Sequence, residues 1–177
     1  RPRVVAFSYC YHGSVDETFV RMGPDGSTQL REGNVGAPID INATTRVAEF
    51  NDLGSVERAL SQGDVACIIT EPALTNIGIV LPEPGFLEGV RELCSEYGAL
   101  LLIDETHTIS AGPGGCTRAW NLDPDIFVIG KSIGGGVPSG AYGITNEVAD
   151  RAAAHVEADL VDVGGVGGKI GRAHVCT

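Results

Sequence analysis

A carboxylate and an amine each follow a short apolar run in this sequence, and together they could do chemistry. Asp104 comes directly after residues 100–103 (LLLI), and Lys131 comes two positions after residues 126–129 (IFVI). The chain has only one other lysine, Lys169, close to the C-terminus. Apolar runs of this length predict strands that are buried on both faces, as in parallel α/β sheets. Because ligands bind beyond the carboxyl ends of such strands, we expect Asp104 and Lys131 to share a site.

Two interpretations of this pair need no organic cofactor. In a nucleotide-binding module, residues 101–105 (LLIDE) would be a Walker B strand and residues 130–132 (GKS) the end of a Walker A loop. That loop needs a glycine five residues before Gly130, where the chain has Asp125, whose charge would repel phosphate. The second interpretation is a structural salt bridge between Asp104 and Lys131, which by itself would add little stability.

The third interpretation is a site for pyridoxal phosphate. The aldehyde of this cofactor forms a Schiff base with a lysine amine, and its pyridine nitrogen stays protonated beside a carboxylate. Lys131 and Asp104 supply one of each. The glycines at 134–136 would let the backbone approach the cofactor closely. We expect no metal centre, because the five cysteines form no CxxC pair.

Several motifs along the chain share one order with a known family. They are residues 11–13 (YHG), 71–72 (EP) with Asn76, 102–106 (LIDET), 124–125 (PD) and 130–143 (GKSIGGGVPSGAYG). With these motifs, residues 4–145 resemble the class III aminotransferases, which are pyridoxal-phosphate enzymes of fold type I. Within that family, the resemblance is strongest to the glutamate-1-semialdehyde 2,1-aminomutase-like branch.

The resemblance implies roles for the residues that would hold the cofactor ring. Lys131 would be the Schiff-base lysine and would also carry the proton between the substrate Cα and the cofactor. Asp104 would pair with the pyridinium nitrogen. Tyr11 would stack on one face of the ring, and Thr106 would lie where the family packs a valine on the opposite face.

Three further residues are expected around the edge of the ring. The resemblance places His107 and Asn76 near the phenolic oxygen of the cofactor, and Glu71 behind them as a group that orders that edge. The residues themselves favour a turn-stabilising role for His12 rather than a catalytic one. Glu105 is left out of the expected catalytic set, as a loop carboxylate.

The resemblance implies a transaminase that moves an amino group between an amino acid or amine and a keto acid or aldehyde. One alternative is a glutamate-1-semialdehyde 2,1-aminomutase, although Ile109 stands where that branch has a small residue. An alternative of another class is a non-catalytic or nucleotide-binding α/β module. The family also implies a homodimer, with the active sites at the subunit interface.

The elements around these residues alternate in the way that predicts an α/β fold. We expect strands at 4–9, 65–70, 100–103, 126–129 and 141–144, and helices beginning near residues 52, 85 and 146. Residues 22–46 have no sustained period and predict a long irregular loop. The expected fold is therefore a mostly parallel sheet with helices on both faces, part of a fold type I large domain.

Composition limits the partners that we expect. The formal charge of −11 disfavours nucleic acid and anionic membranes, and no apolar run is long enough to span a bilayer. Cysteine use favours the cytoplasm. We expect residues 1–168 to be part of a large cofactor-binding domain and 169–177 to be a non-native tail. We also expect this piece alone to be inactive, because phosphate-binding segments of the family would lie outside it.

Overall fold

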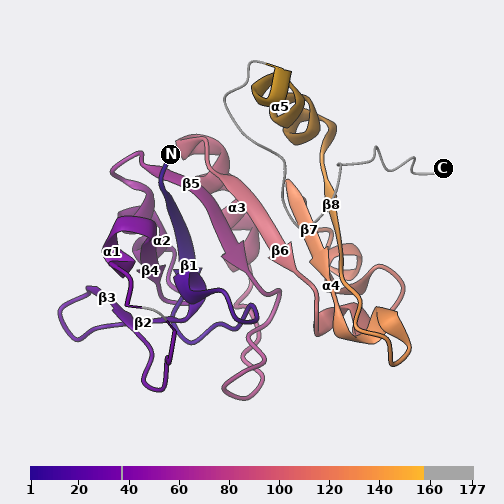
Figure 1. The fold of residues 1–177 in the computed structure, drawn as a ribbon, viewed down its shortest axis with the longest axis horizontal. Helices are drawn as coiled ribbons and strands as arrows, with labels where there is room; N and C mark the ends of the chain where they lie inside the picture. The colour runs from indigo at the N-terminus through magenta and orange to yellow at the C-terminus, as the bar shows by residue number, and fades with distance from the viewer. Residues whose placement is uncertain (37, 158–177) are drawn as a thin grey trace.

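A six-stranded sheet forms the centre of the protein in the computed structural model, which describes residues 1–36 and 38–157 (Figure 1). The strands lie in the order β4-β1-β5-β6-β7-β8. Their bounds are β1 Arg3–Phe7, β4 Thr45–Ala48, β5 Val65–Thr70, β6 Leu100–Asp104, β7 Ile126–Ile129 and β8 Ala141–Ile144. The first five are parallel to their neighbours, and β8 runs antiparallel to β7. The predicted mostly parallel α/β fold is confirmed.

Two amphipathic helices pack together over β1, β4 and β6. Helix α2 (Leu53–Leu60) begins where the side chain of Asp52 accepts a hydrogen bond from the Ser55 amide at 3.0 Å, as the sequence predicts. Helix α3 (Phe86–Tyr97) ends at Gly98, which takes the left-handed conformation common after helices. Both helices bury their apolar faces in the main hydrophobic core, together with β1, β5 and β6.

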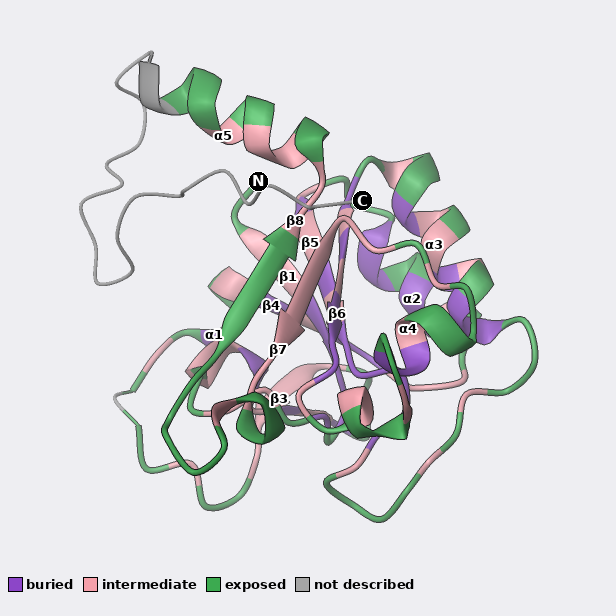
Figure 2. Cartoon of the chain, turned by 90° about the vertical axis from the view of Figure 1, so that its right-hand side faces the viewer, coloured by how far each residue is buried: buried purple, intermediate pink, exposed green. Residues whose placement is uncertain are grey.

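The sheet is buried unevenly. The side chains of β1 become fully buried along the strand, whereas all four residues of β7 are only half-buried and β8 is mostly exposed. Figure 2 shows β8 in green and β7 in pink for this reason. The expectation that residues 126–129 are covered on both faces is therefore wrong for the described part of the chain. Helix α5 (Asn146–Glu157) follows β8 and stands away from α2 and α3 (Figure 1).

The expected irregular loop at 22–46 contains more structure than its sequence predicts. Strands β2 (Val20–Met22) and β3 (Thr28–Leu30) form an antiparallel hairpin, and the short helix α1 (Ile41–Thr44) leads directly into β4. Strand β4 was missed because Arg46 interrupts its apolar pattern. That arginine reaches across the end of the strand to Asp64, whose carboxylate it contacts at 2.8 Å.

The remaining elements are short. They are helix α4 (Gly115–Ala119) and the 3-10 helices η1 (Asp16–Thr18), η2 (Thr108–Ala111) and η3 (Lys131–Gly134). Within the described residues, no helix combines the length and the apolarity needed to cross a membrane. Residues 158–177, which include Lys169 and the expected non-native tail, lie outside the described residues.

Candidate active site

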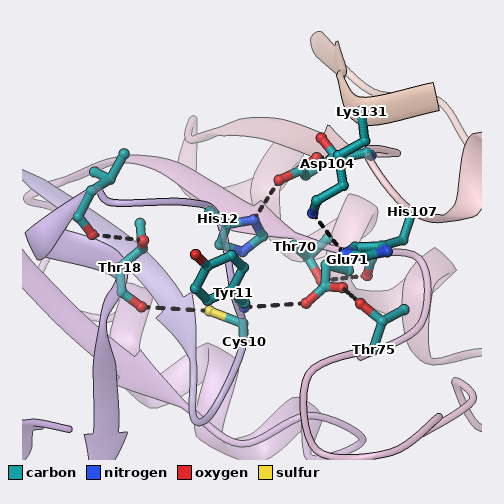
Figure 3. A network of polar contacts seen from close by, with 12 residues as sticks. Cys10, Tyr11, His12, Thr18, Thr70, Glu71, Thr75, Asp104, His107 and Lys131 are labelled. Atoms are coloured by element: carbon teal, nitrogen blue, oxygen red, sulfur yellow. Dashed lines mark hydrogen bonds and ion pairs between the residues drawn. The ribbon is translucent and has the colours of Figure 1, made fainter. Parts of the chain in front are cut away.

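The carboxyl ends of four parallel strands bring the predicted residues to one edge of the sheet. Tyr11 and His12 follow β1, Glu71 follows β5, Asp104 ends β6, and Lys131 follows β7 (Figure 3). These strands are neighbours in the order β1-β5-β6-β7. Residues separated by up to 120 positions in the chain therefore lie in one small region, at the edge where α/β sheets bind ligands.

Asp104 is held by two hydrogen bonds at this edge. Its Oδ2 lies 2.8 Å from Nδ1 of His12, and its Oδ1 accepts a bond of 3.0 Å from the Thr106 amide. The side chains of His12 and Asp104 are 2% and 10% exposed. Nε2 of His12 is fully buried and has no hydrogen-bond partner within the described residues. The Asp104 carboxylate is thus oriented by a buried imidazole.

The two groups of this pair shift one another's protonation. Burial disfavours a charged imidazole, but the hydrogen bond to Asp104, together with Cys10 beside the ring, outweighs burial and raises the pKa of His12 to about 10. Burial also acts against a charged Asp104, and the hydrogen bonds from His12 and Thr106 outweigh it, so the pKa of Asp104 is lowered. Both directions describe an imidazolium paired with a carboxylate near neutral pH.

Lys131 lies in a different environment from the one expected of an ion pair. It starts η3 with a left-handed backbone, φ +46, which costs a residue with a side chain about 1–2 kcal/mol. Its Nζ lies 2.7 Å from Nε2 of His107 and 5.9 Å from the centre of the Tyr11 ring. Among the described residues, Lys131 forms no ion pair, and Asp104 pairs with His12. The interpretation of Asp104 and Lys131 as a structural salt bridge is therefore wrong.

Glu71 supports the loop that carries Tyr11. Its buried carboxylate accepts a hydrogen bond from the Tyr11 amide at 3.2 Å and another from the Thr75 hydroxyl at 2.6 Å. Tyr11 as a whole residue is 37% exposed, and its ring packs edge-on against Phe19, with ring centres 6.4 Å apart. Glu71 thus acts on Tyr11 through the backbone, which places it behind the site rather than in it.

Among the described residues, Thr106 contacts those at the edge of the sheet, whereas Asn76 does not. The Thr106 amide bonds to Asp104, and a Cβ on Gly130, the residue before Lys131, would lie 3.5 Å from the Thr106 side chain. Asn76 is oriented toward Arg31. With its amide oxygen turned to that guanidinium, it accepts hydrogen bonds of 3.2 and 2.9 Å. The contacts of the described residues therefore connect Asn76 to the β3 segment and not to Lys131 or His107.

Sequence reasoning undervalued two residues of this region. His12 was expected to stabilise a turn, but the structure buries it against Asp104. The signal that could have indicated this contact is that His12 follows a predicted strand, as Asp104 does, and strand ends of a parallel sheet meet at one edge. Glu105 is fully buried, and its carboxylate accepts hydrogen bonds from the Thr108 hydroxyl and from the amides of Cys116 and Thr117. It holds the start of α4 in place, so it is a buried structural group where the sequence suggested an ordinary loop carboxylate.

A mostly parallel sheet with an amine, a carboxylate and an aromatic ring at its carboxyl edge is the arrangement expected of pyridoxal-phosphate transferases of fold type I. Comparison with known proteins agrees with this class. The chain belongs to the aminotransferase class-III family, whose model matches residues 1–158.

Individual relatives cover nearly the whole chain. It is 42% identical over 173 residues to a glutamate-1-semialdehyde 2,1-aminomutase from Syntrophomonas wolfei, covering 95% of this chain and 39% of that protein. A crystal structure of a glutamate-1-semialdehyde-aminomutase from Pseudomonas aeruginosa PAO1 is 44% identical, with a TM-score of 0.86, covering 97% of this chain and 37% of that one. An omega-transaminase from Sphaerobacter thermophilus is 34% identical with a TM-score of 0.76, covering 84% and 36%. The chain spans between about one-third and two-fifths of the length of the curated relatives that it matches.

The residues at the edge of the sheet fit pyridoxal phosphate. The exposed Lys131 amine lies over the Tyr11 ring, so an aldehyde bonded to that amine would start beside an aromatic face. The Asp104 carboxylate has a lowered pKa and is available as an ionised partner for a pyridinium nitrogen. The nucleotide-binding interpretation fits less well, because Lys131 begins a single 3-10 turn rather than the α-helix that follows a Walker A loop.

Proposed function

We propose that the protein is a pyridoxal-phosphate-dependent transaminase that moves an amino group between an amino acid or amine and a keto acid or aldehyde. The observation that carries this proposal is the convergence of Asp104 and Lys131, with Tyr11 beside the lysine amine, at the ends of neighbouring strands. The family and the high coverage of the chain by aminomutase and transaminase structures support it. When bound, the cofactor supplies an electron sink that stabilises charge left on the substrate Cα after its proton is removed.

Within this proposal, each residue has a task that its position allows. Lys131 would hold the cofactor through its amine, and the same amine, when free, would accept the proton that leaves the substrate Cα. Asp104, oriented by His12 and Thr106, keeps the ring nitrogen protonated. Tyr11 covers one face of the ring, with Glu71 fixing its backbone. Thr106 lies toward the other face, and His107 and Asn76 stay as proposed contacts of the phenolic edge.

The covalent role of Lys131 can be tested directly on the full-length protein. Adding pyridoxal phosphate should produce a visible absorbance band, and borohydride should then fix a pyridoxyl group on Lys131, found by peptide mapping. The Lys131→Ala variant should lose the label and at least about 10³-fold of the transamination rate, because it lacks both the anchor and the proton carrier. A label on another lysine would contradict the proposal, and ATP binding with no label would favour the nucleotide module.

A second candidate activity is that of a glutamate-1-semialdehyde 2,1-aminomutase, favoured by the identity of 42–44% to proteins with that name. The segment after Asp104 opposes it in part, because Ile109 lies in η2 beside the site, where that branch has a small residue. Turnover of glutamate-1-semialdehyde without any second substrate would identify the mutase. Dependence on a separate amino donor and carbonyl acceptor would identify the transaminase.

The same proposal extends to the assembly and location of the protein. We propose that residues 1–168 are part of the large cofactor-binding domain, that the full-length protein forms a homodimer, and that its substrates are small molecules rather than nucleic acid or membranes. The four described cysteines are free thiols, which supports a reducing compartment such as the cytoplasm. Light scattering of the full-length protein tests the dimer.

A further inference from the structure

The proposed function does not explain why the side chains of His107 and Lys131 contact one another. His107 was expected at the phenolic edge of the cofactor, yet its Nε2 lies 2.7 Å from the Lys131 amine (Figure 3). This is hydrogen-bond distance for two nitrogens. The lysine amine can donate a hydrogen to Nε2 when the imidazole carries its own hydrogen on Nδ1, so the geometry suits a hydrogen bond between the two groups.

The backbone on both sides of His107 is anchored, so its position is determined by the fold. On one side, the Thr106 amide is bonded to Asp104 at 3.0 Å. On the other side, the Thr108 hydroxyl is bonded to the fully buried carboxylate of Glu105. The carbonyl of His107 itself accepts a bond of 2.9 Å from the Ser110 hydroxyl. These contacts fix the backbone that carries the imidazole, and the ring itself contacts the Lys131 amine.

His107 is also open to water, which gives a proton a route out. Both His107 and Lys131 are exposed, and no described carboxylate forms an ion pair with the lysine amine. The titratable groups around the pair are Tyr11, whose ring lies 5.9 Å from the amine, and Asp104 and Glu71 (Figure 3). Asp104 is engaged by His12, and Glu71 is engaged by Tyr11 and Thr75.

We propose that His107 is a positioning residue for Lys131 that holds its free amine and takes up its excess proton. An N–H bond of the ammonium breaks and its electron pair stays on Nζ, while the proton bonds to the lone pair of Nε2 in the tautomer with hydrogen on Nδ1. The products are a neutral amine, able to attack an aldehyde or accept a Cα proton, and an imidazolium that returns the proton to water. This inference rests on the proposed role of Lys131.

Reconstitution of the full-length, cofactor-free protein with pyridoxal phosphate measures this step without any amino donor. Borohydride quenching at intervals, followed by mapping of Lys131, gives the rate at which the covalent bond forms. For His107→Ala we expect that rate to fall about tenfold near neutral pH, with the loss shrinking at alkaline pH, where hydroxide can remove the proton. His107→Gln, which can accept a hydrogen bond but not a proton, should be equally slow.

Added imidazole provides the decisive readout, because it can replace a missing proton acceptor but not a missing packing contact. About 50 mM imidazole should restore at least half of the rate in His107→Ala and leave His107→Gln slow. His155→Gln is the matched control, since His155 is an exposed histidine on α5, and its rate should equal that of the wild type.

The outcomes separate this inference from the proposed function. A wild-type protein that takes no label on Lys131 contradicts the transaminase proposal itself. If Lys131 is labelled and His107→Ala reacts at the wild-type rate, the inference about His107 is wrong and the proposed function stands. A slow His107→Ala that imidazole does not restore, or a His107→Gln that reacts normally, would also overturn proton uptake by His107.

Discussion

At the scale of single residues, the site is organised by two histidines that have opposite surroundings. His12 is buried and pairs with Asp104, whereas His107 is exposed and contacts Lys131. The first pairs with a carboxylate of lowered pKa, and the second lies beside the lysine that we propose carries protons. The same side chain therefore supports two different tasks, because burial and partner determine what an imidazole does.

The His12–Asp104 pair predicts a specific dependence of stability on pH. The folded pKa of His12, about 10, lies above the unfolded value of about 6.5, so folding binds its proton more tightly. Its contribution is fully present below about pH 6.5 and is lost as the pH rises through about 10. We expect the melting temperature of the wild type to fall by at least about 3 °C more between these limits than that of His12→Gln.

Thermal denaturation of the full-length protein across this pH range would check the prediction. His155→Gln serves as the control, because it removes an exposed histidine and should retain the wild-type pH dependence. The His12→Gln variant should also be less stable at neutral pH, since the partly buried Asp104 loses its charged partner. Equal pH dependence in the wild type and His12→Gln would show that His12 is not an imidazolium in the folded protein.

At the scale of elements, the turn between β6 and α4 is built around Glu105. Its carboxylate bonds to two amides at the start of α4, and the two glycines before them, Gly114 and Gly115, both have positive φ. A Cβ on Gly115 would lie 2.6 Å from Oε2 of Glu105, closer than real Cβ contacts allow. This close approach positions α4 and the η2 segment that follows His107.

Alanine substitutions at Gly63 and Gly115 distinguish the cost of a steric contact with Glu105 from the cost of a positive φ angle. Gly63→Ala places a Cβ at φ +70 in open space and should cost about 1 kcal/mol of unfolding free energy. Gly115→Ala, at φ +61, should cost about 1–3 kcal/mol more, because it also pushes against a buried carboxylate. Urea denaturation of both variants measures the difference. Equal losses would mean that the Glu105 turn relaxes freely.

At the scale of the whole molecule, the candidate site joins strands that are buried to different degrees. Its residues come from the ends of β1, β6 and β7, and β7 is only half-buried while β8 is mostly exposed. A cofactor bound to Lys131 and Asp104 would tie β7 to the well-packed centre of the sheet. A ligand that binds only the folded state stabilises it by mass action.

Removing the cofactor should therefore lower the stability of the full-length protein. With pyridoxal phosphate at 100 times its dissociation constant, the expected stabilisation is about 2.7 kcal/mol. Differential scanning fluorimetry of the loaded and stripped protein should show a lower melting temperature after stripping, reversed when the cofactor is added back. In Lys131→Ala, only the smaller non-covalent part of the effect should persist. An unchanged melting temperature in the wild type would contradict cofactor binding.

The sequence by itself determined the class of the sheet, most strand positions and the residue types of the site. The apolar runs before Asp104 and Lys131 predicted the positions of β6 and β7, because continuous apolar residues are typical of strands in parallel sheets, although β7 is only half-buried. Such local patterns are visible without any tertiary information. The four-residue edge strand β4 was missed, because its pairing with β1 depends on contacts far along the chain.

Only the tertiary structure decided which of these side chains meet. Local sequence carries no distance between residues 92 positions apart, such as His12 and Asp104, or 24 positions apart, such as His107 and Lys131. Those distances follow from the strand order β1-β5-β6-β7 and from the turns beyond each strand. The tertiary structure thus ruled out the Asp104–Lys131 salt bridge, one of the three interpretations of the sequence, because the fold brings His12 within hydrogen-bond distance of Asp104 and His107 within hydrogen-bond distance of Lys131.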